Sequence, residues 1–140
     1  MSDERLVIVD TNVFFSGLSV RPGNPAAVLR MVKWPQMSVS LDLLAEYRRV
    51  LYSERAIRYL ELATHEWDAV IEAIERQAVL EAPMSGPNCP DPMDQHLWDL
   101  LATVEASDLV TGERKLLASH HFPGRIFRRD SSWRCRCEVP

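Results

Sequence analysis

The stretch Leu6-Val-Ile-Val-Asp10-Thr-Asn-Val13, near the start of the chain, decides the fold. Four consecutive apolar residues, three of them β-branched, predict a short strand over 6–9 that is buried on both faces. A strand of this kind is typical of a parallel sheet whose two faces are covered by helices. The polar residues Asp10-Thr-Asn that follow predict a turn at the carboxyl end of this strand.

Outward from this strand, strands and helices alternate along the chain. Short apolar runs predict further strands over 37–40, 109–111 and 125–128. Segment 82–92 carries four prolines and a glycine, which predicts a loop. Apolar residues at helical spacing predict helices over 25–34, around 43–51, from 64 to about 79, over 94–105 and around 116–117. The alternation indicates an α/β fold, a three-layer α/β/α sandwich with a central parallel sheet.

The length and composition are those of one ordinary globular domain, with 140 residues of which 46% are hydrophobic and 26% charged. We expect a single domain over 1–140, with a loosely attached basic tail from about residue 130. The chain starts without a basic and apolar leader and has no run of about 20 apolar residues. We therefore expect a cytoplasmic protein with no membrane contact, and its three unevenly spaced cysteines fit a reducing compartment.

The charge balance limits how the protein meets nucleic acid. A formal net charge of -4 argues against coating RNA or DNA by bulk electrostatics, because such binding needs many lysines and arginines. Two basic stretches nevertheless stand out, one over 48–58 and one over 125–136. The acidic residues are then expected to concentrate in a site that collects cations.

Four acidic residues are expected at one edge of the sheet. Asp10 closes the first strand, and Glu113 comes two residues after Thr111 closes a later one. Glu46 lies in the helix after the second strand, and Asp94 opens the helix that leads back to the sheet. Because ligands of open parallel sheets bind beyond the carboxyl ends of the strands, these positions predict a common site.

Converging carboxylates predict a metal ion. Like charges at close range disfavour the ionised forms, and a divalent cation removes that repulsion. Hard oxygen ligands suit Mg²⁺ or Mn²⁺, so Asp10, Asp94 and Glu113 are the predicted metal ligands. An ion held in this way acidifies a bound water and stabilises charge on a phosphate, which makes phosphodiester hydrolysis the natural reaction.

Each acid also has a structural interpretation. A polar turn such as the one at Asp10 often only caps the end of a strand. Glu46 fits a solvated helix position equally well. Asp91, Asp94 and Glu113 fit helix N-termini, where the helix dipole favours an acid by roughly 0.3 to 1 kcal/mol without any further function.

Two other aspartates are predicted to lie away from the site. Asp108 precedes its predicted strand, so we expect it at the opposite edge of the sheet in a structural role. Asp99 comes five residues after Asp94 and is expected on a different, solvated face of the helix. In the basic tail, Trp133 is predicted to stack on a base or to contact a partner.

Four segments in this order resemble the PIN domain family. They are Val7-Ile-Val-Asp10-Thr-Asn-Val13, then Glu46 in its helix, then Cys89-Pro-Asp91-Pro-Met-Asp94, then Ser107-Asp-Leu-Val-Thr111-Gly-Glu113-Arg-Lys-Leu-Leu117. The resemblance covers roughly residues 5–128. More narrowly, the sequence is similar to toxin components of toxin-antitoxin systems, relatives of the VapC toxins.

The resemblance implies a ribonuclease that depends on Mg²⁺ or Mn²⁺ and hydrolyses RNA phosphodiester bonds. Carried over by position, Asp10, Glu46 and Asp94 match acids of the family. Glu113 stands where the family usually has Asp, and its side chain reaches one methylene farther. The resemblance therefore leaves open whether a second metal position is shifted, weakened or lost.

Supporting residues and partners are implied by the same resemblance. Asn12 is expected to orient Asp10 or a bound water, Thr111 to contact water or phosphate, and Asp91 to serve as an accessory ligand or a structural residue. A cognate antitoxin protein is the expected partner, placing a basic side chain in the acidic pocket. A homodimer is the expected assembly.

Two other functions stay open beside the ribonuclease. One is a non-catalytic PIN-like domain that binds RNA or a partner with a weakened metal site, which Glu113 and the negative net charge favour. The other is a phosphotransfer enzyme with Asp10 as its nucleophile. That interpretation lacks the second aspartate expected two positions on, where Asn12 stands instead.

Overall fold

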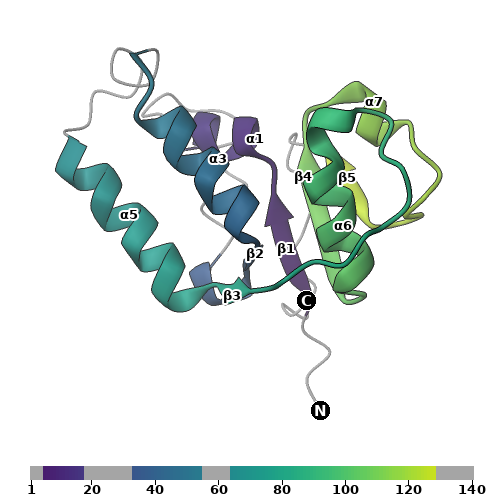
Figure 1. Ribbon diagram of the computed structural model, residues 1–140, viewed down its shortest axis with the longest axis horizontal. Helices are drawn as coiled ribbons and strands as arrows, with labels where there is room; N and C mark the ends of the chain where they lie inside the picture. Colours follow the sequence, from purple (N-terminus) through teal and green to yellow (C-terminus); the bar gives the residue numbers. More distant parts are fainter. Residues whose placement is uncertain (1–4, 18–32, 55–63, 129–140) are drawn as a thin grey trace, which may run out of the picture.

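The computed structural model describes residues 5–17, 33–54 and 64–128 (Figure 1). The short 3-10 helices are labelled η. In chain order the elements are β1 (Leu6–Val9), α1 (Thr11–Gly17), η1 (Trp34–Gln36), β2 (Ser38–Val39), α3 (Leu41–Leu51), α5 (Thr64–Gln77), β3 (Val79–Leu80), η2 (Pro92–Asp94), α6 (Gln95–Thr103), β4 (Ser107–Thr111), α7 (Arg114–Leu117) and β5 (Ile126–Arg128).

All pairings between the described strands are parallel. β4 lies between β1 and β5, and Leu6 of β1 pairs with Ser107 of β4. β2 pairs with β3, and a single parallel bridge between Val7 and Met37 joins this pair to β1. The strands therefore follow the order β3-β2-β1-β4-β5, and their carboxyl ends share one edge.

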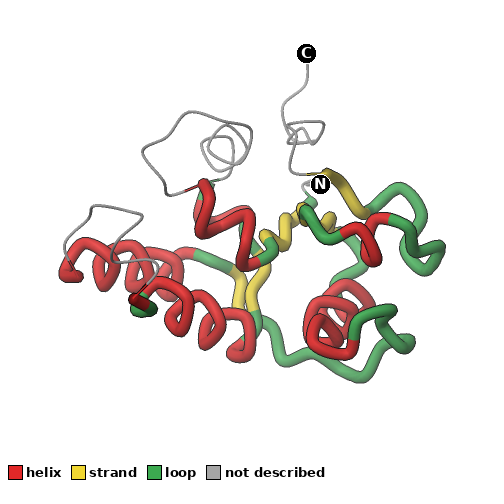
Figure 2. Tube along the Cα trace, turned by 90° about the horizontal axis from the view of Figure 1, so that it is seen from above, coloured by secondary structure: helices red, strands yellow, loops and turns green. Residues whose placement is uncertain are grey.

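Helices cover both sides of this sheet. Figures 1 and 2 show α3 and α5 packed together on one side of the strands, with α6 and α7 on the other. The apolar run of β1 is buried, and Val7, Ile8 and Val9 are at most 1% exposed. The prediction of a three-layer α/β/α sandwich with a central parallel sheet is confirmed.

Helix α3 shows how local sequence builds the side of the site. Ser40 caps its start, because the Ser40 hydroxyl accepts a hydrogen bond of 3.1 Å from the Leu43 amide. Acid in its first turn and arginine in its last turn suit the helix dipole. Its buried face consists of Leu43, Leu44, Tyr47 and Leu51.

An aromatic stack fixes α3 against α1, and a hydrogen bond fixes it against β1. The rings of Phe14 and Tyr47 lie 4.2 Å apart at an angle of 14°. The buried Tyr47 hydroxyl donates a hydrogen bond to the carbonyl of Val9, one residue before the turn. Since Glu46 precedes Tyr47, this anchor also sets where Glu46 stands relative to the end of β1.

Several element boundaries differ from those predicted. The two-residue strand β3 was not predicted, because the apolar pattern of the preceding helix runs on to Val79. β4 begins at Ser107, earlier than predicted, and α6 ends at Thr103. Most of the predicted helix over 25–34, and the basic tail from residue 130, lie outside the described residues.

Two predictions about aspartates need correction. Asp108 lies inside β4 rather than before it, although it is buried and paired with Arg5 at 2.9 Å, which is a structural role. Asp99 is not a solvated residue. Its carboxylate accepts hydrogen bonds from the Gly86 amide (2.8 Å) and from Gln95 Nε2 (2.9 Å), so it ties the 82–91 loop to α6.

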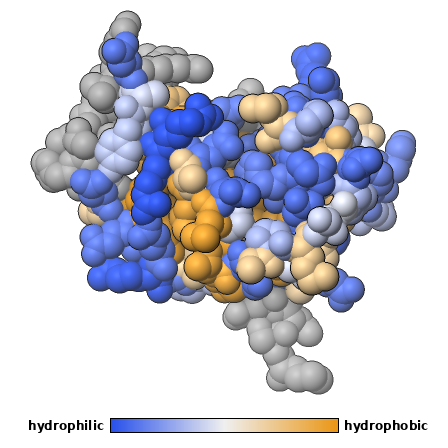
Figure 3. Space-filling view, in the orientation of Figure 1, coloured by the Kyte–Doolittle hydropathy of each residue, from blue (hydrophilic) through white to orange (hydrophobic). Residues whose placement is uncertain are grey.

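The surface is mostly hydrophilic on the face drawn in Figure 3, with one apolar patch where α3 and β3 come together. Leu41 and Leu80, from these two elements, are 71% and 56% exposed. Among the described helices, none is both long and apolar enough to pass through a bilayer.

Candidate active site

Asp10 lies at the end of β1, where the backbone leaves the sheet. Its amide donates to the carbonyl of Val110 at 3.0 Å, which extends the β1–β4 ladder to this residue. The side chain is 8% exposed, and burial raises its pKa above the ordinary value of 3.8. Hydrogen bonds from the Thr111 hydroxyl and the Thr11 amide oppose that rise, because both stabilise the ionised form.

Thr111, at the end of the neighbouring strand, orients Asp10. Its hydroxyl donates to Asp10 Oδ2 at 2.6 Å and accepts from the Glu113 amide at 3.0 Å. The expected contact of Thr111 with water or phosphate stays a prediction beside this contact with Asp10. Asn12 is exposed in α1 and makes no hydrogen bond to Asp10 in the described part of the chain, and its expected contact with a bound water stays a prediction.

Asp94 lies where the loop enters α6, and its charge is the least compensated in the site. Burial, followed by the charges of Asp10, Asp91, Glu113 and Glu46, raises its pKa from 3.8 to about 6. The Asp94 carboxylate makes no helix-capping hydrogen bond. Asp94 does stand at the N-terminus of α6, where the helix dipole favours an acid, and it also interacts electrostatically with four other acids.

Glu46 reaches this cluster from α3 but is turned toward cationic partners. One carboxylate oxygen pairs with Arg49 at 2.9 Å, and the other lies 3.4 Å from His96 Nε2. The charge of Glu46 raises the pKa of both Asp10 and Asp94. Glu46 is thus half-buried beside the other acids rather than a freely solvated helix residue.

Glu113 and Asp91 both cap short helices. The Glu113 carboxylate accepts from the Lys115 amide at 3.4 Å at the start of α7. The Asp91 carboxylate accepts from the Met93 amide at 3.0 Å at the start of η2. The structural interpretation holds for these two residues, yet the charge of each also raises the pKa of Asp94, so both lie near the site.

His96 is a site residue that the sequence analysis missed. It lies in the first turn of α6, two residues after Asp94, and contacts Glu46 through Nε2. Its charge lowers the pKa of Asp10. His96 Nδ1 is buried and has no hydrogen-bond partner among the described residues. Its short distance from Asp94 along the chain was the signal that could have identified it.

The donor set fits a hard divalent cation in its chemistry. It offers several carboxylates, and a cation between them would relieve the repulsion that raises the pKa of Asp94. Within 5–17, 33–54 and 64–128, no three His, Cys, Asp or Glu side chains already stand in a metal-binding arrangement. Two of the acids are engaged with protein groups, Glu46 with Arg49 and Glu113 with the Lys115 amide.

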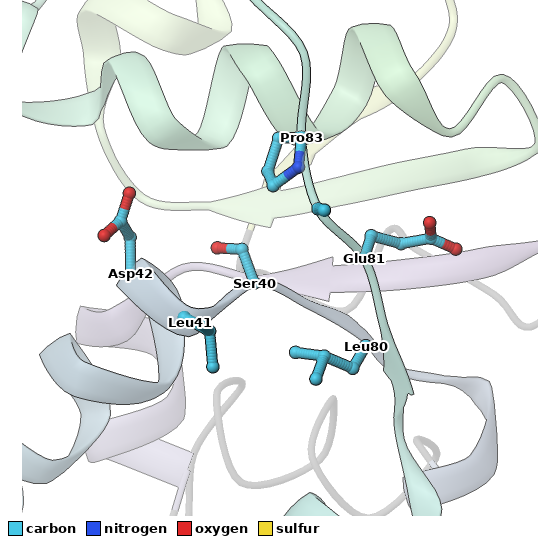
Figure 4. A pocket seen from close by; sticks show the side chains of 7 residues that line it. Ser40, Leu41, Asp42, Leu80, Glu81 and Pro83 are labelled. Carbon is cyan, nitrogen blue, oxygen red and sulfur yellow. The ribbon is translucent and has the colours of Figure 1, made fainter.

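A separate hollow lies farther along the same edge of the sheet. It has a volume of about 440 Å³ at the carboxyl ends of β2 and β3 (Figure 4). Its walls carry two acids, Asp42 and Glu81, together with the apolar side chains of Leu41, Leu80 and Pro83. None of the acids of the cluster lines it, so it is not part of that cluster.

Carboxylates gathered at the carboxyl edge of a parallel sheet are typical of proteins that hold a divalent metal ion. The sequence agrees, because residues 6–115 match the profile of the PIN domain family. The chain therefore belongs to the PIN domain family, whose members are typically nucleases that use divalent metal ions. No curated protein and no solved structure matches it.

Proposed function

We propose that this protein is a divalent-metal-dependent endoribonuclease that hydrolyses RNA phosphodiester bonds. The observation that carries the proposal is the Asp94 carboxylate, whose pKa is raised to about 6 by burial and by four neighbouring acids. A family of nucleases that use divalent metal ions supplies the chemical setting. Perturbed carboxylates in such a setting favour a functional site over a merely structural one.

The chain's own residues have distinct tasks in this proposal. The proposed ligands of Mg²⁺ or Mn²⁺ are Asp10, Asp94 and Glu113. Glu46 is the fourth catalytic acid beside these ligands. When bound, the metal ion supplies an acidified water and neutralises charge on the phosphate. Thr111 keeps Asp10 in one orientation through its 2.6 Å hydrogen bond, and burial keeps competing water from that carboxylate.

Glu113 determines how the site is completed. Its longer side chain caps α7 through its own carboxylate, so it must rotate toward Asp94 to reach a shared cation. We infer that this rotation exchanges one weak hydrogen bond of 3.4 Å for a metal contact. We therefore expect the complete metal site to form only when metal and RNA bind.

The test is the substitution Asp10→Asn, which keeps the shape and hydrogen-bonding capacity of the side chain but removes its charge. We expect cleavage of a labelled RNA in Mn²⁺ to fall by at least about 100-fold, since even partners of metal ligands are worth about 10- to 100-fold. Asp42→Asn, a matched change at an exposed position on the same edge, should cleave like the wild type.

Folding and metal binding complete this test. Far-UV circular dichroism should be the same for both variants, and calorimetry should detect Mn²⁺ binding to the wild type and to Asp42→Asn only. Retained cleavage by folded Asp10→Asn would reject the mechanism. Trapping of a phosphoaspartate at Asp10 would favour the phosphotransfer alternative.

A second candidate function is a non-catalytic domain that binds RNA or a protein partner. The observation that favours it is the engagement of Glu46 and Glu113 with protein groups, which leaves no ready metal arrangement among the described residues. A Mn²⁺ titration separates the two functions. Absence of Mn²⁺ binding by the wild type, together with RNA binding, would support this candidate and reject the nuclease.

We further propose that the nuclease acts as the toxin of a toxin-antitoxin module in the cytoplasm and forms a homodimer. The excess of acidic charge around Asp94 supports a partner that inserts a basic side chain there. Co-expression with the product of the adjacent short reading frame should suppress RNA cleavage and give a complex on size exclusion. A lone, unsuppressed monomer would contradict both expectations.

A further inference from the structure

A second hollow lies beside the acid cluster and differs from it in charge. It has a volume of about 370 Å³ and is lined by Arg114, Leu117 and Ala118 from the α7 region and by Arg128 from the end of β5. Both arginines are exposed. The size is in the range of small-ligand sites, and the lining combines two guanidinium groups with an apolar wall.

The hollow stands one strand away from the acids. Arg128 of β5 pairs in register with Thr111 of β4, and the Thr111 hydroxyl holds the Asp10 carboxylate. Neighbouring strands are about 4.8 Å apart. Arg114 directly follows Glu113 in the chain. Both arginines therefore project from the same edge of the sheet as the acids, on the side of β5.

These two arginines differ from others in the described part of the chain. Arg5 pairs with Asp108, and Arg49 pairs with Glu46. Arg125 donates hydrogen bonds to backbone carbonyls. Arg114 and Arg128 form no ion pair with any described acid. In a chain of net charge -4, two guanidinium groups that pair with no described acid and share one hollow indicate a site for an anion.

We propose that this hollow binds a backbone phosphate of the RNA strand next to the bond that is cut. The proposal rests on the nuclease function above and assigns the direction in which the strand leaves the acids. Guanidinium groups bind phosphate oxygens through paired, charge-assisted hydrogen bonds, and such contacts position a nucleic acid without reading its sequence.

The other side of the edge is unsuited to the same strand. The hollow at the ends of β2 and β3 is lined by the carboxylates of Asp42 and Glu81, which repel phosphate (Figure 4). The charge therefore changes along this edge of the sheet. Acids lie at the ends of β2 and β3, the acids proposed to bind metal lie in the middle, and arginines lie at the end of β5 and in α7. An RNA strand is drawn toward α7 and β5 rather than toward β3.

The experiment measures RNA binding without cleavage. A dye-labelled, single-stranded RNA of mixed sequence is titrated in EDTA by fluorescence anisotropy over a range of KCl concentrations. The double variant Arg114→Gln/Arg128→Gln should bind about tenfold more weakly at about 0.15 M salt. The slope of log affinity against log salt should become shallower by about 0.7, because one phosphate contact on a single strand contributes about 0.7.

The control carries the same change of net charge at residues that do not line the hollow. Lys115→Gln/Arg76→Gln removes two exposed cations, one of them next to Arg114, and should bind RNA nearly as the wild type does. An oligonucleotide with an uncharged methylphosphonate backbone should show no difference between the two double variants. Circular dichroism should show that both are folded.

The outcomes separate this inference from the nuclease function. Binding by the double variant equal to that of the control, an unchanged salt slope, or a wild type that binds no RNA would each overturn the phosphate site. Metal-dependent cleavage by the wild type would then still support the nuclease. Conversely, a changed salt slope in a protein that never cleaves RNA would support the phosphate site and reject the nuclease.

Discussion

Asp94 is ionised at neutral pH in surroundings that oppose its charge. Folding raises its pKa from 3.8 to about 6, so the folded protein binds this proton more tightly than the unfolded chain. The resulting stabilisation is complete below about pH 3.8 and is lost as the pH rises through about 6. We expect Asp94→Asn to raise the free energy of unfolding at pH 7.5 by roughly 1 kcal/mol, a value reduced for partial exposure.

Urea unfolding at pH 7.5 and pH 4 measures this effect. The increase in the free energy of unfolding caused by Asp94→Asn should be present at pH 7.5. It should be small at pH 4, where the wild-type carboxyl is already protonated in the folded state. Glu72→Gln, an exposed change of the same charge on α5, should have little effect at either pH. Saturating Mn²⁺ should reverse the order and make the wild type the more stable protein. A destabilised Asp94→Asn variant at pH 7.5 would contradict the repulsion described here.

The Thr111 hydroxyl makes two hydrogen bonds, because it donates to Asp10 and accepts from the Glu113 amide. Valine has nearly the same shape but lacks the hydroxyl, so Thr111→Val leaves the buried Asp10 oxygen and the Glu113 amide without this partner. We expect a loss of about 1 to 3 kcal/mol in the free energy of unfolding. Thr111→Ser keeps the hydroxyl and should lose less than about 1 kcal/mol. Equal losses for the two variants in chemical denaturation would show that packing alone is responsible.

At the residue scale, the sequence identified the acids but not their partners. Asp10, Asp94 and Glu113 follow from their positions after strands or at a helix start, and their role as metal ligands stays a prediction. The contact between Thr111 and Asp10 joins distant parts of the chain, and no local pattern encodes it. His96 was missed because a lone histidine in a helix is not specific to a site, although its place two residues after Asp94 pointed to the acid cluster.

The loop before α6 passes so close to the helix at Gly86 that a side chain there requires its neighbours to shift. A Cβ built there would lie 3.0 Å from both the Ala102 Cβ and the Trp98 carbonyl oxygen. Gly86→Ala should therefore push the loop away from α6 and cost about 1 to 3 kcal/mol of stability. Ser85→Ala, at the exposed neighbouring position, should cost little.

Native-state hydrogen exchange reports this change at the loop itself. The Gly86 amide donates to Asp99 in the wild type and should be protected from exchange, whereas in Gly86→Ala the amide at this position and its neighbours should exchange faster. The site should respond as well, because the same loop carries Asp91 and leads to Asp94. Unaltered exchange and stability would mean that the loop rearranges freely.

At the element scale, most elements were predictable, including the short β2, β5 and α7, but α1 was interpreted as a turn and β3 was not predicted. The strand β1 and the helices α3 and α6 follow from runs with one clear period, and their packing agrees with it. β3 has only two residues and is recognisable only through its pairing with β2. Asp99 was misplaced because helical spacing gives a residue's face, while the loop that covers that face comes from tertiary packing.

At the scale of the whole molecule, the sequence predicted a parallel sheet but not its strand order. The order β3-β2-β1-β4-β5 depends on which distant strands meet, and only the folded chain determines that. The same strand order determines which charged residues lie next to one another along the carboxyl edge of the sheet. The chain is acidic overall, yet strands β4 and β5 place Glu113 and Arg128 within the same region.

Arg125 has a consequence for synthesis of the chain. Its guanidinium group donates to the carbonyls of Leu101, Val104 and Ser107, which end α6 and begin β4. On the ribosome these carbonyls emerge before Arg125, although Arg5 also donates to the Ser107 carbonyl and the Ser107 hydroxyl donates to that of Val104. The corner between α6 and β4 is therefore expected to gain its full set of hydrogen bonds only once Arg125 has left the ribosome.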